Sequence, residues 1–557
     1  MSNKTINTTM YSDKENINIL TALLMSHGVE WAVVCPGSRN APIVHNLNAC
    51  GRIRCCAITD ERSAAFYALG MAQSMRKPVV ICVTSGSALL NVAPAVAEAA
   101  YQHLPLVVIS ADRPAEWIDQ LDGQTLRQPA ALADLVAKSV TIPEPHNDGQ
   151  RWHCQRLINE ALLACRGRTD APVHINVPIS EPLFNYNIYA LPAVAHIDSH
   201  LSRFCHMSDK TKTLISQSDR ILMVIGQTGA PRQHQVESLA NNMSGAMVVW
   251  HEPLSGSLGG VPFDMALQMM EAEGIDISSY HPNLIIYIGD TLVSKRGRQF
   301  LRQSQAPTIL FTQDATHVAD PTQHLVMIEE YGRDDDLVSL FDDIAITPDQ
   351  SFISLWNERL QHATQTIADL QPEYSYRWAV KYLEEQLDDL YLDIYVHYAN
   401  SMAVRYATLY ANHYVYCNRG VNGIEGTLST SAGFSIASPD DLVLCVIGDL
   451  SFFYDQNALW NRNLGGNLRV MLVNDHGGGI FANVKGMPHN DETDIMVAGS
   501  HTADARGICT QNDIGYIQAT NIDQLRMGIV QLLTMQTHRP VVLEVLINNQ
   551  QSIISNQ

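Results

Sequence analysis

Motifs that would indicate a zinc or a redox site are missing from this sequence. Its 11 cysteines form no Cys-x-x-Cys pair, and its 21 histidines form no His-Glu-x-x-His motif. Cys82 and Cys445 lie inside apolar runs, which is typical of reduced thiols in a protein core. Charged residues are few, at 17%, and the formal net charge is −21. The basic face that nucleic-acid binding requires is therefore not expected.

Long uncharged runs are also scarce. One run, residues 78–97, could be mistaken for a membrane span, but Ser85-Gly86-Ser87, Asn91 and Pro94 interrupt it. It fits a buried strand, a loop and a helix better than a helix in lipid. The polar start of the chain lacks the apolar core of a signal peptide. We therefore expect a cytoplasmic protein without membrane insertion.

Short apolar runs, each followed by a glycine-bearing loop and a helical stretch, recur along the 557 residues. This alternation predicts an α/β protein whose mainly parallel sheets are flanked by helices. The runs form three series, and the first and third are alike in length and layout. We predict three domains: residues 1–186, a Rossmann-like domain at 207–345, and residues 372–557. Residues 170–178 would form the last strand of the first domain, residues 187–206 a linker, and residues 329–371 a mainly helical connector.

Two acidic loops of the third series form the strongest local signal. Gly448-Asp449-Leu450-Ser451 follows one apolar strand, and Asn474-Asp475-His476-Gly477 follows another, with Asp475 placed 26 residues after Asp449. That spacing suits a strand–helix–strand crossover, which would bring the two loops side by side. Carboxylate and carbonyl oxygens hold Mg²⁺ well while diphosphate completes its shell. Either loop alone is more often a helix cap or a glycine turn.

The paired loops resemble the diphosphate-binding motif of thiamine diphosphate (ThDP) enzymes. The resemblance implies a metal held by Asp449, Asp475 and the carbonyl of Gly477, with Mg²⁺ as the ion and Mn²⁺ as an alternative. Two positions depart from the usual pattern, because Leu450 replaces a glycine and Asp475 replaces an asparagine. The extra carboxylate suits the metal but adds negative charge beside the diphosphate.

A second part of the resemblance lies near the start of the chain. Glu61, in Asp60-Glu61-Arg62 after a strand, matches the glutamate that activates the cofactor's aminopyrimidine ring in ThDP enzymes. Thr84-Ser85-Gly86 resembles the loop beside that ring. Taken alone, Glu61 is more often an acid that complements a helix dipole.

Further motifs narrow the resemblance to the ThDP-dependent 2-succinyl-5-enolpyruvyl-6-hydroxy-3-cyclohexene-1-carboxylate (SEPHCHC) synthase family of menaquinone biosynthesis. These motifs run in order from residue 36 to residue 481, and the middle series and the last seventy or so residues match only weakly. They include Pro36-Gly37-Ser38-Arg39, Ala111-Asp112-Arg113-Pro114, Gln124 with Arg127-Gln128-Pro129, Asn400-Ser401 with Arg405, and Asn418-Arg419-Gly420 with Gly423-Ile424.

The resemblance implies a pyrimidine-binding, a central Rossmann-like and a diphosphate-binding domain. It also implies decarboxylation of 2-oxoglutarate and addition of the resulting succinyl semialdehyde carbanion to isochorismate. Ile424 would bend the cofactor under its thiazolium ring and so act with Glu61 in catalysis. The implied cofactor-binding residues are Ser85, Gly86, Asn400, Ser401, Ile424, Asp449, Leu450, Ser451, Asp475 and Gly477. The implied substrate-binding residues are Ser38, Arg39, Arg113, Gln124, Lys295, Arg405 and Arg419.

Family members place the cofactor between two subunits, so a homodimer or homotetramer is implied. A cationic pocket suits the carboxylates of both substrates, although each cation taken singly is more often on the surface. Lys295 fits least well, because Arg296 and Arg298 follow it on what would be a solvated helix face. Two other functions stay open. One is a different ThDP-dependent 2-oxoacid lyase, such as an acetohydroxyacid synthase, and the other is a nucleotide-binding scaffold without chemistry.

Overall fold

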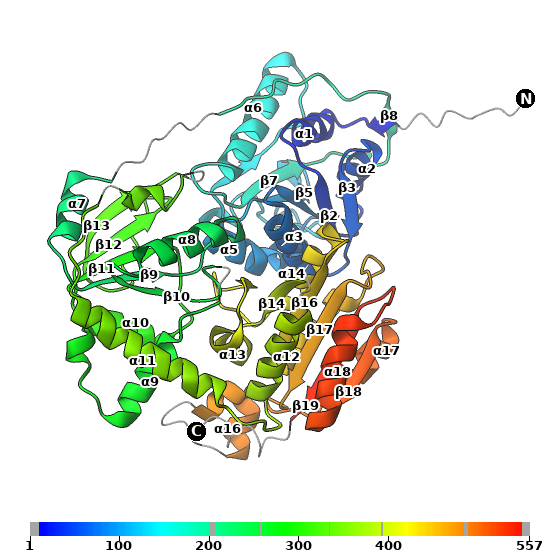
Figure 1. Cartoon of the computed structure of the whole chain (residues 1–557). Helices are drawn as coiled ribbons and strands as arrows, with labels where there is room; N and C mark the ends of the chain where they lie inside the picture. Colours follow the sequence, from blue (N-terminus) through cyan, green and yellow to red (C-terminus); the bar gives the residue numbers. More distant parts are fainter. Residues whose placement is uncertain are drawn as a thin grey trace, which may run out of the picture.

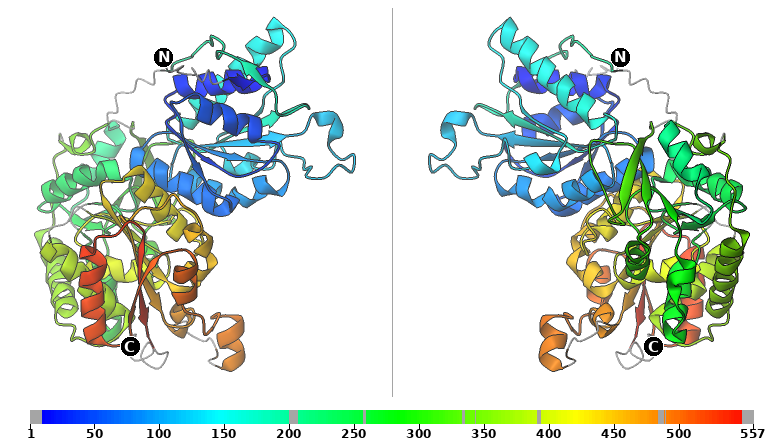
Figure 2. Two further views of the ribbon diagram at one scale, coloured as in Figure 1. Left: turned by 90° about the vertical axis from the view of Figure 1, so that its right-hand side faces the viewer. Right: turned by 90° about the vertical axis from the view of Figure 1, so that its left-hand side faces the viewer.

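Parallel strands form three sheets in the computed structural model, as the sequence predicted. The structure describes residues 10–199, 207–256, 259–332, 335–342, 344–390, 394–483, 488 and 490–547. Figures 1 and 2 show the units built on the first and third sheets meeting at two helices, α3 and α14, with the middle unit (green) beside both.

The first sheet has six parallel strands in the order β3-β2-β4-β5-β7-β6. Val80 and Cys82 of β4 pack on one face, and Val79, Ile81 and Val83 on the other, as a strand buried on both faces requires. The strands are β2 (Trp31–Val34), β3 (Arg54–Ala57), β4 (Val79–Val83), β5 (Leu106–Asp112), β6 (Lys138–Thr141) and β7 (Val173–Pro178). The helices are α1 (Glu15–Ser26), α2 (Ala41–Ala49), α3 (Glu61–Met75), α4 (Ser87–Asn91), α5 (Ala93–Tyr101) and α6 (Asp148–Cys165).

The third sheet repeats this strand order, as β15-β14-β16-β17-β19-β18, and is also parallel. The similar layout of the two series therefore reflects one shared topology. Its strands are β14 (Ile394–Tyr398), β15 (Val415–Tyr416), β16 (Leu442–Gly448), β17 (Leu468–Asn474), β18 (Gly515–Ala519) and β19 (Val541–Leu546). Its helices are α12 (Tyr376–Leu390), α13 (Met402–Tyr410), α14 (Thr427–Ala437), α15 (Asp449–Tyr454), α16 (Asp491–Met496), α17 (Arg506–Gln511) and α18 (Ile522–Thr534).

The middle sheet has the order β10-β9-β11-β12-β13, the arrangement of a doubly wound Rossmann-like unit. Separate apolar clusters cover its two faces. Its strands are β9 (Ile221–Ile225), β10 (Val248–His251), β11 (Leu284–Ile288), β12 (Thr308–Thr312) and β13 (Leu325–Glu330). Its helices are α7 (Asp209–Ser216), α8 (Gln233–Met243), α9 (Phe263–Glu273), α10 (Lys295–Gln303) and α11 (Gln350–Ala368).

Helices α3 and α14 join the first and third units in close contact. A Cβ atom on Gly70 would lie 1.9 Å from the carbonyl oxygen of Thr430, and one on Gly433 would lie 2.1 Å from that of Tyr67. The Tyr67 hydroxyl also donates to the carbonyl of Ala458. One apolar cluster runs through both units, so their sheets are held in a fixed relation.

Several local details differ from the sequence-based expectations. The predicted linker begins with a strand, β8 (Tyr186–Ile188), which pairs with β1 (Tyr11–Ser12), and residues 200–206 lie outside the described residues. The predicted connector at residues 329–371 starts in β13, which is part of the middle sheet. Glu61, expected after a strand, is the first residue of α3, whose first turn the Asp60 side chain caps.

The described cysteines form no disulfide, and Cys82 and Cys445 are buried as expected. Among the described helices, none is both long and apolar enough to cross a membrane. Residues 1–9, which include most of the polar start, lie outside the described residues.

Candidate active site

Asp449 and Asp475 lie together at the carboxyl edge of the third sheet. Strands β16 and β17 are parallel neighbours. Asp449 is the first residue of α15, directly after β16, and Asp475 directly follows β17. Both side chains are buried, at 2% and 6% exposure. Burial raises the pKa of Asp449, and burial together with the Asp449 charge raises the pKa of Asp475 to about 7. Two mutually repelling buried carboxylates form an electrostatic site for a cation.

Three donors fix the Asp449 carboxylate. The Leu450 amide donates to Oδ1 at 2.6 Å, and the Gly477 amide donates to Oδ2 at 2.9 Å. The backbone N–H of Ala503 donates to Nδ1 of His501 at 3.1 Å, so Nε2 of that ring carries the proton and donates to Oδ2 of Asp449 at 3.1 Å. Outer partners of this kind orient a ligating carboxylate.

The donor atoms at this edge fit a hard divalent cation. Two carboxylates are present, and the Gly477 carbonyl, which accepts from the Gly479 amide at 3.2 Å, adds a third oxygen. The buried Tyr376 hydroxyl faces the same edge, 3.9 Å from where a Gly448 Cβ would lie, and bonds to none of the described residues. Within the described ranges, no three His, Cys, Asp or Glu side chains form a metal site by themselves. A cation here would therefore need backbone and ligand oxygens, as Mg²⁺ commonly does.

Asn400 and Ser401 lie at the carboxyl end of the neighbouring strand, β14. Ser401 adopts a left-handed conformation with φ of 71° and directly precedes α13. The Asn400 amide nitrogen donates to the carbonyls of Asn418 and Gly423, at 2.6 and 2.7 Å. This wraps the loop that carries Arg419 around Asn400. Ile424 follows in this loop with 42% exposure, so its side chain stands open.

Glu61 and the Ser85-Gly86 loop lie at the carboxyl edge of the first sheet. Glu61 accepts a hydrogen bond from Asn91 at 3.0 Å. Gly86 has φ of 86°, which favours glycine, and its amide donates to the buried Gln128 side chain at 2.8 Å. No hydrogen bond or ion pair within the described residues joins Glu61 to the Asp449 loop. The two parts do meet beside Glu61, where the Arg62 guanidinium donates to the carbonyl of Tyr454, the last residue of α15, at 2.7 Å, and the Asn457 amide donates to Asp60 at 2.7 Å.

Two of the predicted substrate residues lie close to the Gly86 loop. A Cβ atom on Gly86 would lie 3.3 Å from the Cα atom of Gln124, and the Arg113 guanidinium donates to the Gly123 carbonyl at 3.0 and 3.2 Å. Arg39 is buried and bonds to the Ile179 carbonyl at 3.1 Å and to Glu181 at 3.0 Å. Ser38, beside it, is exposed.

Arg405 and Arg419 form a second cationic group. The Arg419 charge lowers the pKa of Arg405 in addition to the larger effect of burial, so the two guanidinium groups are near each other. Arg419 is 8% exposed and donates to Asn400 at 3.1 Å, while its Nε bonds to none of the described residues. Arg405 lines a cavity of about 100 Å³ with Ser294 and Asp264. Lys295 is exposed at the first residue of α10.

Sequence reasoning missed three residues that support this site: Gln128, Tyr376 and His501. Gln128 was only part of a quoted motif, although it links Gly86 to the Ala111 carbonyl and to Asn176. Tyr376 and His501 stand in no recognisable motif. Their roles depend on contacts with residues far away in the chain, which a local pattern does not reveal.

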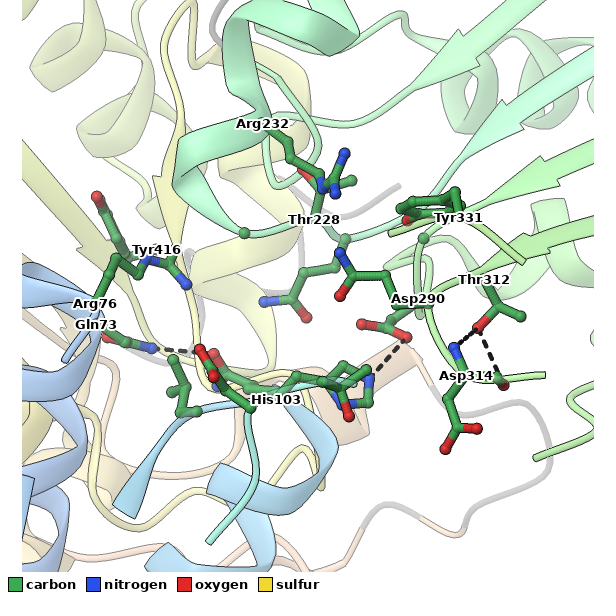
Figure 3. A pocket seen from close by; sticks show the side chains of 18 of the residues that line it. Gln73, Arg76, His103, Thr228, Arg232, Asp290, Thr312, Asp314, Tyr331 and Tyr416 are labelled. Carbon is green, nitrogen blue, oxygen red and sulfur yellow. Dashed lines mark hydrogen bonds and ion pairs between the residues drawn. The ribbon is translucent and has the colours of Figure 1, made fainter. Parts of the chain in front are cut away.

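A cavity of about 340 Å³ lies between the three units and is lined by none of the predicted site residues (Figure 3). Two pairs of its lining residues are in ion-pair contact, His103 with Asp290 at 3.7 Å and Arg166 with Asp170 at 3.1 Å. Cys417, two residues before Arg419, forms part of its wall.

Comparison with known proteins shows to which class of enzyme this chain belongs. Residues 17–132 match the family described as thiamine pyrophosphate enzyme, N-terminal TPP binding domain. Together with the paired acids on the third sheet, this match identifies a ThDP-dependent enzyme.

The narrower assignment comes from full-length relatives. The chain is 38% identical to the 2-succinyl-5-enolpyruvyl-6-hydroxy-3-cyclohexene-1-carboxylate synthase of Bacteroides fragilis, over 97% of both chains. It is also 38% identical to the synthase of the same name from Bacteroides thetaiotaomicron, over 97% of both chains. The synthase from Desulfotalea psychrophila is 35% identical, over 85% of this chain and 87% of its own. The chain therefore belongs to the SEPHCHC synthase family.

Proposed function

We propose that the chain converts 2-oxoglutarate and isochorismate to SEPHCHC and CO₂ in menaquinone biosynthesis. The observation that carries this proposal is the pair of buried acids Asp449 and Asp475 directly after two adjoining strands, in a chain 38% identical to SEPHCHC synthases along its length. When bound, ThDP supplies the acidic carbon that adds to a 2-oxo acid and the electron sink for loss of CO₂.

Asp449, Asp475 and the Gly477 carbonyl would hold Mg²⁺, with Mn²⁺ as an alternative. The remaining diphosphate contacts would come from the loops at the ends of β14 and β16, which carry Asn400, Ser401, Leu450 and Ser451. Helix α13 follows Ser401 directly, and the first backbone N–H groups of a helix would be available to a phosphate there.

Glu61 would hold a proton on the pyrimidine ring, with its carboxylate against the ring nitrogen. The Asn91 amide orients that carboxylate at 3.0 Å. Ser85 and Gly86 would line the same ring, and Gln128 fixes the Gly86 amide. Ile424, open to solvent in the single chain, would support the bent cofactor.

The cations would bind the carboxylates of the two substrates. Arg405 and Arg419 lie near each other at the third sheet and suit 2-oxoglutarate. Isochorismate would be bound by Arg113, Gln124 and Lys295. Ser38 and Arg39 would contact its edge. Burial of Arg419 strengthens its attraction for an anion, because little water screens it.

The enzyme would be a cytoplasmic homodimer or homotetramer with each active site between two subunits. The lack of a hydrogen bond or ion pair between Glu61 and the Asp449 loop among the described residues supports a shared site. So does the connection between β5 and β6, which projects from the body in Figure 2 and exposes Trp117 and Leu121. We keep the division into three domains, residues 1–186, 207–345 and 372–557, as part of this proposal. Each of them contains one of the three parallel sheets.

A product assay tests the function. Purified protein is incubated with ThDP, Mg²⁺, 2-oxoglutarate and isochorismate, and the product is identified by mass spectrometry. SEPHCHC formation that requires all four components is expected. Carboligation of pyruvate, or a yellow flavin-bearing protein, would instead favour an acetohydroxyacid synthase-like enzyme. No turnover of any 2-oxo acid would favour a scaffold.

A further inference from the structure

Glu98 is a buried acid that reaches from the first unit into the third. It lies on α5 with 3% exposure. One carboxylate oxygen accepts the backbone N–H of Gly420 at 2.7 Å, and the other accepts that of Val421 at 2.7 Å. The partners are 322 and 323 residues away in the sequence. Glu98 therefore binds a loop of a different unit at two consecutive amides.

The loop is seated closely on α5 at this point. A Cβ atom on Gly420 would lie 2.9 Å from Cβ of Tyr101 and 3.1 Å from the Glu98 carbonyl oxygen. A side chain at position 420 would push the loop away from the helix. The backbone at residues 420 and 421 is thus held by both hydrogen bonds and close contact.

This loop carries residues assigned above to substrate and cofactor. Arg419 immediately precedes the clamped amides, and its guanidinium bonds to Asn400 at 3.1 Å. Asn400 in turn donates to the Asn418 and Gly423 carbonyls, on either side of Gly420 and Val421. The position of Glu98 therefore determines where the backbone of Arg419 lies.

Two glutamines support Glu98 from the wall of the large cavity. The Gln102 amide donates to the Glu98 carboxylate and, at 3.4 Å, to the Cys417 carbonyl. Gln73 donates to Gln102 at 3.0 Å, a contact drawn in Figure 3. A buried carboxylate is costly unless donors satisfy it, and three donors converge on this one.

We infer that Glu98 is a positioning residue for the reaction, which sets the Arg419 loop across the junction of the first and third units. The inference rests on the proposed role of Arg419 at the substrate. Glu98 itself would touch neither substrate nor cofactor. It would act through the backbone of residues 419–421, so its removal should affect the same step that removal of Arg419 affects.

Glu98→Gln is the direct test, with Glu358→Gln on the exposed face of α11 as the matched control. Glutamine keeps one acceptor oxygen but turns an N–H group toward the second amide. We expect kcat/KM for 2-oxoglutarate to fall about ten- to a hundred-fold in Glu98→Gln, with ThDP and Mg²⁺ binding within about two-fold of wild type. The control variant should match wild type in both measurements.

A double-mutant cycle separates positioning from general loss of structure. Because Glu98 acts through Arg419, Glu98→Gln should reduce kcat/KM much less in an Arg419→Ala background than in wild type. Equal effects in the two backgrounds, or a Glu98→Gln variant that behaves like the control, would overturn the inference.

Gln102→Leu provides a second variant should Glu98→Gln fold poorly. It removes one donor to Glu98 and leaves the amides of residues 420 and 421 unchanged, so a smaller loss of kcat/KM for 2-oxoglutarate is expected. Kinetics equal to wild type would contradict the positioning role of Glu98. An inactive wild-type enzyme in the product assay would contradict the proposed function instead, which keeps the two failures apart.

Discussion

At the scale of single residues, the acid pair of the third sheet has an unusual charge balance. In the proposed ThDP motif, Asp475 would replace the usual amide, and burial with the Asp449 charge raises its pKa to about 7. A bound divalent cation would stabilise both carboxylates in their charged form. The two acids should contribute unequally to metal binding, because three hydrogen-bond donors fix the Asp449 carboxylate and none of them fixes Asp475.

Asp449→Ala is expected to weaken ThDP binding at saturating Mg²⁺ by more than about a hundred-fold, since loss of an outer partner alone commonly costs about 10–100-fold. Asp475→Asn is the matched variant, because an amide keeps an oxygen ligand and removes one charge. It should bind ThDP within about ten-fold of wild type by the same scale. Isothermal titration with ThDP measures the affinity of both variants. Wild-type affinity in Asp449→Ala would show that Asp449 does not belong to the metal site.

Glu61→Gln should separate binding from activation. The substitution keeps the shape of the side chain but removes the charge that would hold a proton on the pyrimidine ring. ThDP should still bind, while exchange of the cofactor's C2 proton slows by about 10²–10⁴-fold, the usual contribution of an acid–base group. Exchange is followed by NMR in deuterated water, and an unchanged rate would contradict the assignment.

Arg113→Ala should affect one substrate more than the other. Arg113 bonds to the Gly123 carbonyl, next to Gln124 and the Gly86 loop. Loss of a charge-assisted partner should raise KM for isochorismate about ten- to a hundred-fold, with little change for 2-oxoglutarate. Kinetics with each substrate varied in turn decide this. Equal effects would mean that Arg113 shapes the whole site, and no effect would make it a surface residue.

At the residue level, the sequence allows a prediction where a motif is local and allows none where the contacts are distant. Asp449 and Asp475 were predicted together because each follows an apolar run at crossover spacing, and the structure places them directly after two adjoining strands. Glu98 was missed because its partners lie more than three hundred residues away. His501 was missed because its bond to Asp449 depends on how a loop folds back onto the sheet.

At the scale of elements, the packing of α3 against α14 fixes the relation between the two related sheets. Apolar runs predicted the strands well, because strands buried on both faces are continuously hydrophobic. The close helix contact was not predicted, since Gly70 and Gly433 each look like an ordinary helix glycine in sequence. Only the facing backbone shows why a side chain would not fit there.

Gly433→Ala should therefore destabilise the protein although alanine favours helices. The new methyl group would meet the Tyr67 carbonyl oxygen at 2.1 Å, and overpacking of this kind costs about 1–3 kcal/mol. Gly507→Ala on α17 is the control, because nothing lies within 4 Å of its Cβ position. It should leave stability unchanged or raise it by up to about 1 kcal/mol. Thermal unfolding compares them, and equal midpoints would show that the helices separate at little cost.

At the scale of the whole molecule, no hydrogen bond or ion pair among the described residues joins Glu61 to the Asp449 loop within one chain. The first and third sheets share a strand order and meet through α3 and α14, yet Glu61 and the Asp449 loop lie on separate edges. Two copies of the chain, related by symmetry, would bring the Glu61 edge of one to the Asp449 edge of the other. A site built in this way contains one essential residue from each subunit.

Subunit complementation tests this arrangement without a structure of the assembly. Glu61→Gln and Asp449→Ala should each be nearly inactive alone. If subunits are mixed one to one and exchanged, half of the dimers are mixed, and each mixed dimer has one site with both residues intact. Activity should then recover to about a quarter of wild type by this statistical count. Sedimentation should show a multiple of the 61.6 kDa chain mass. A site contained within one chain would restore nothing on mixing, because every subunit would still carry one of the two defects.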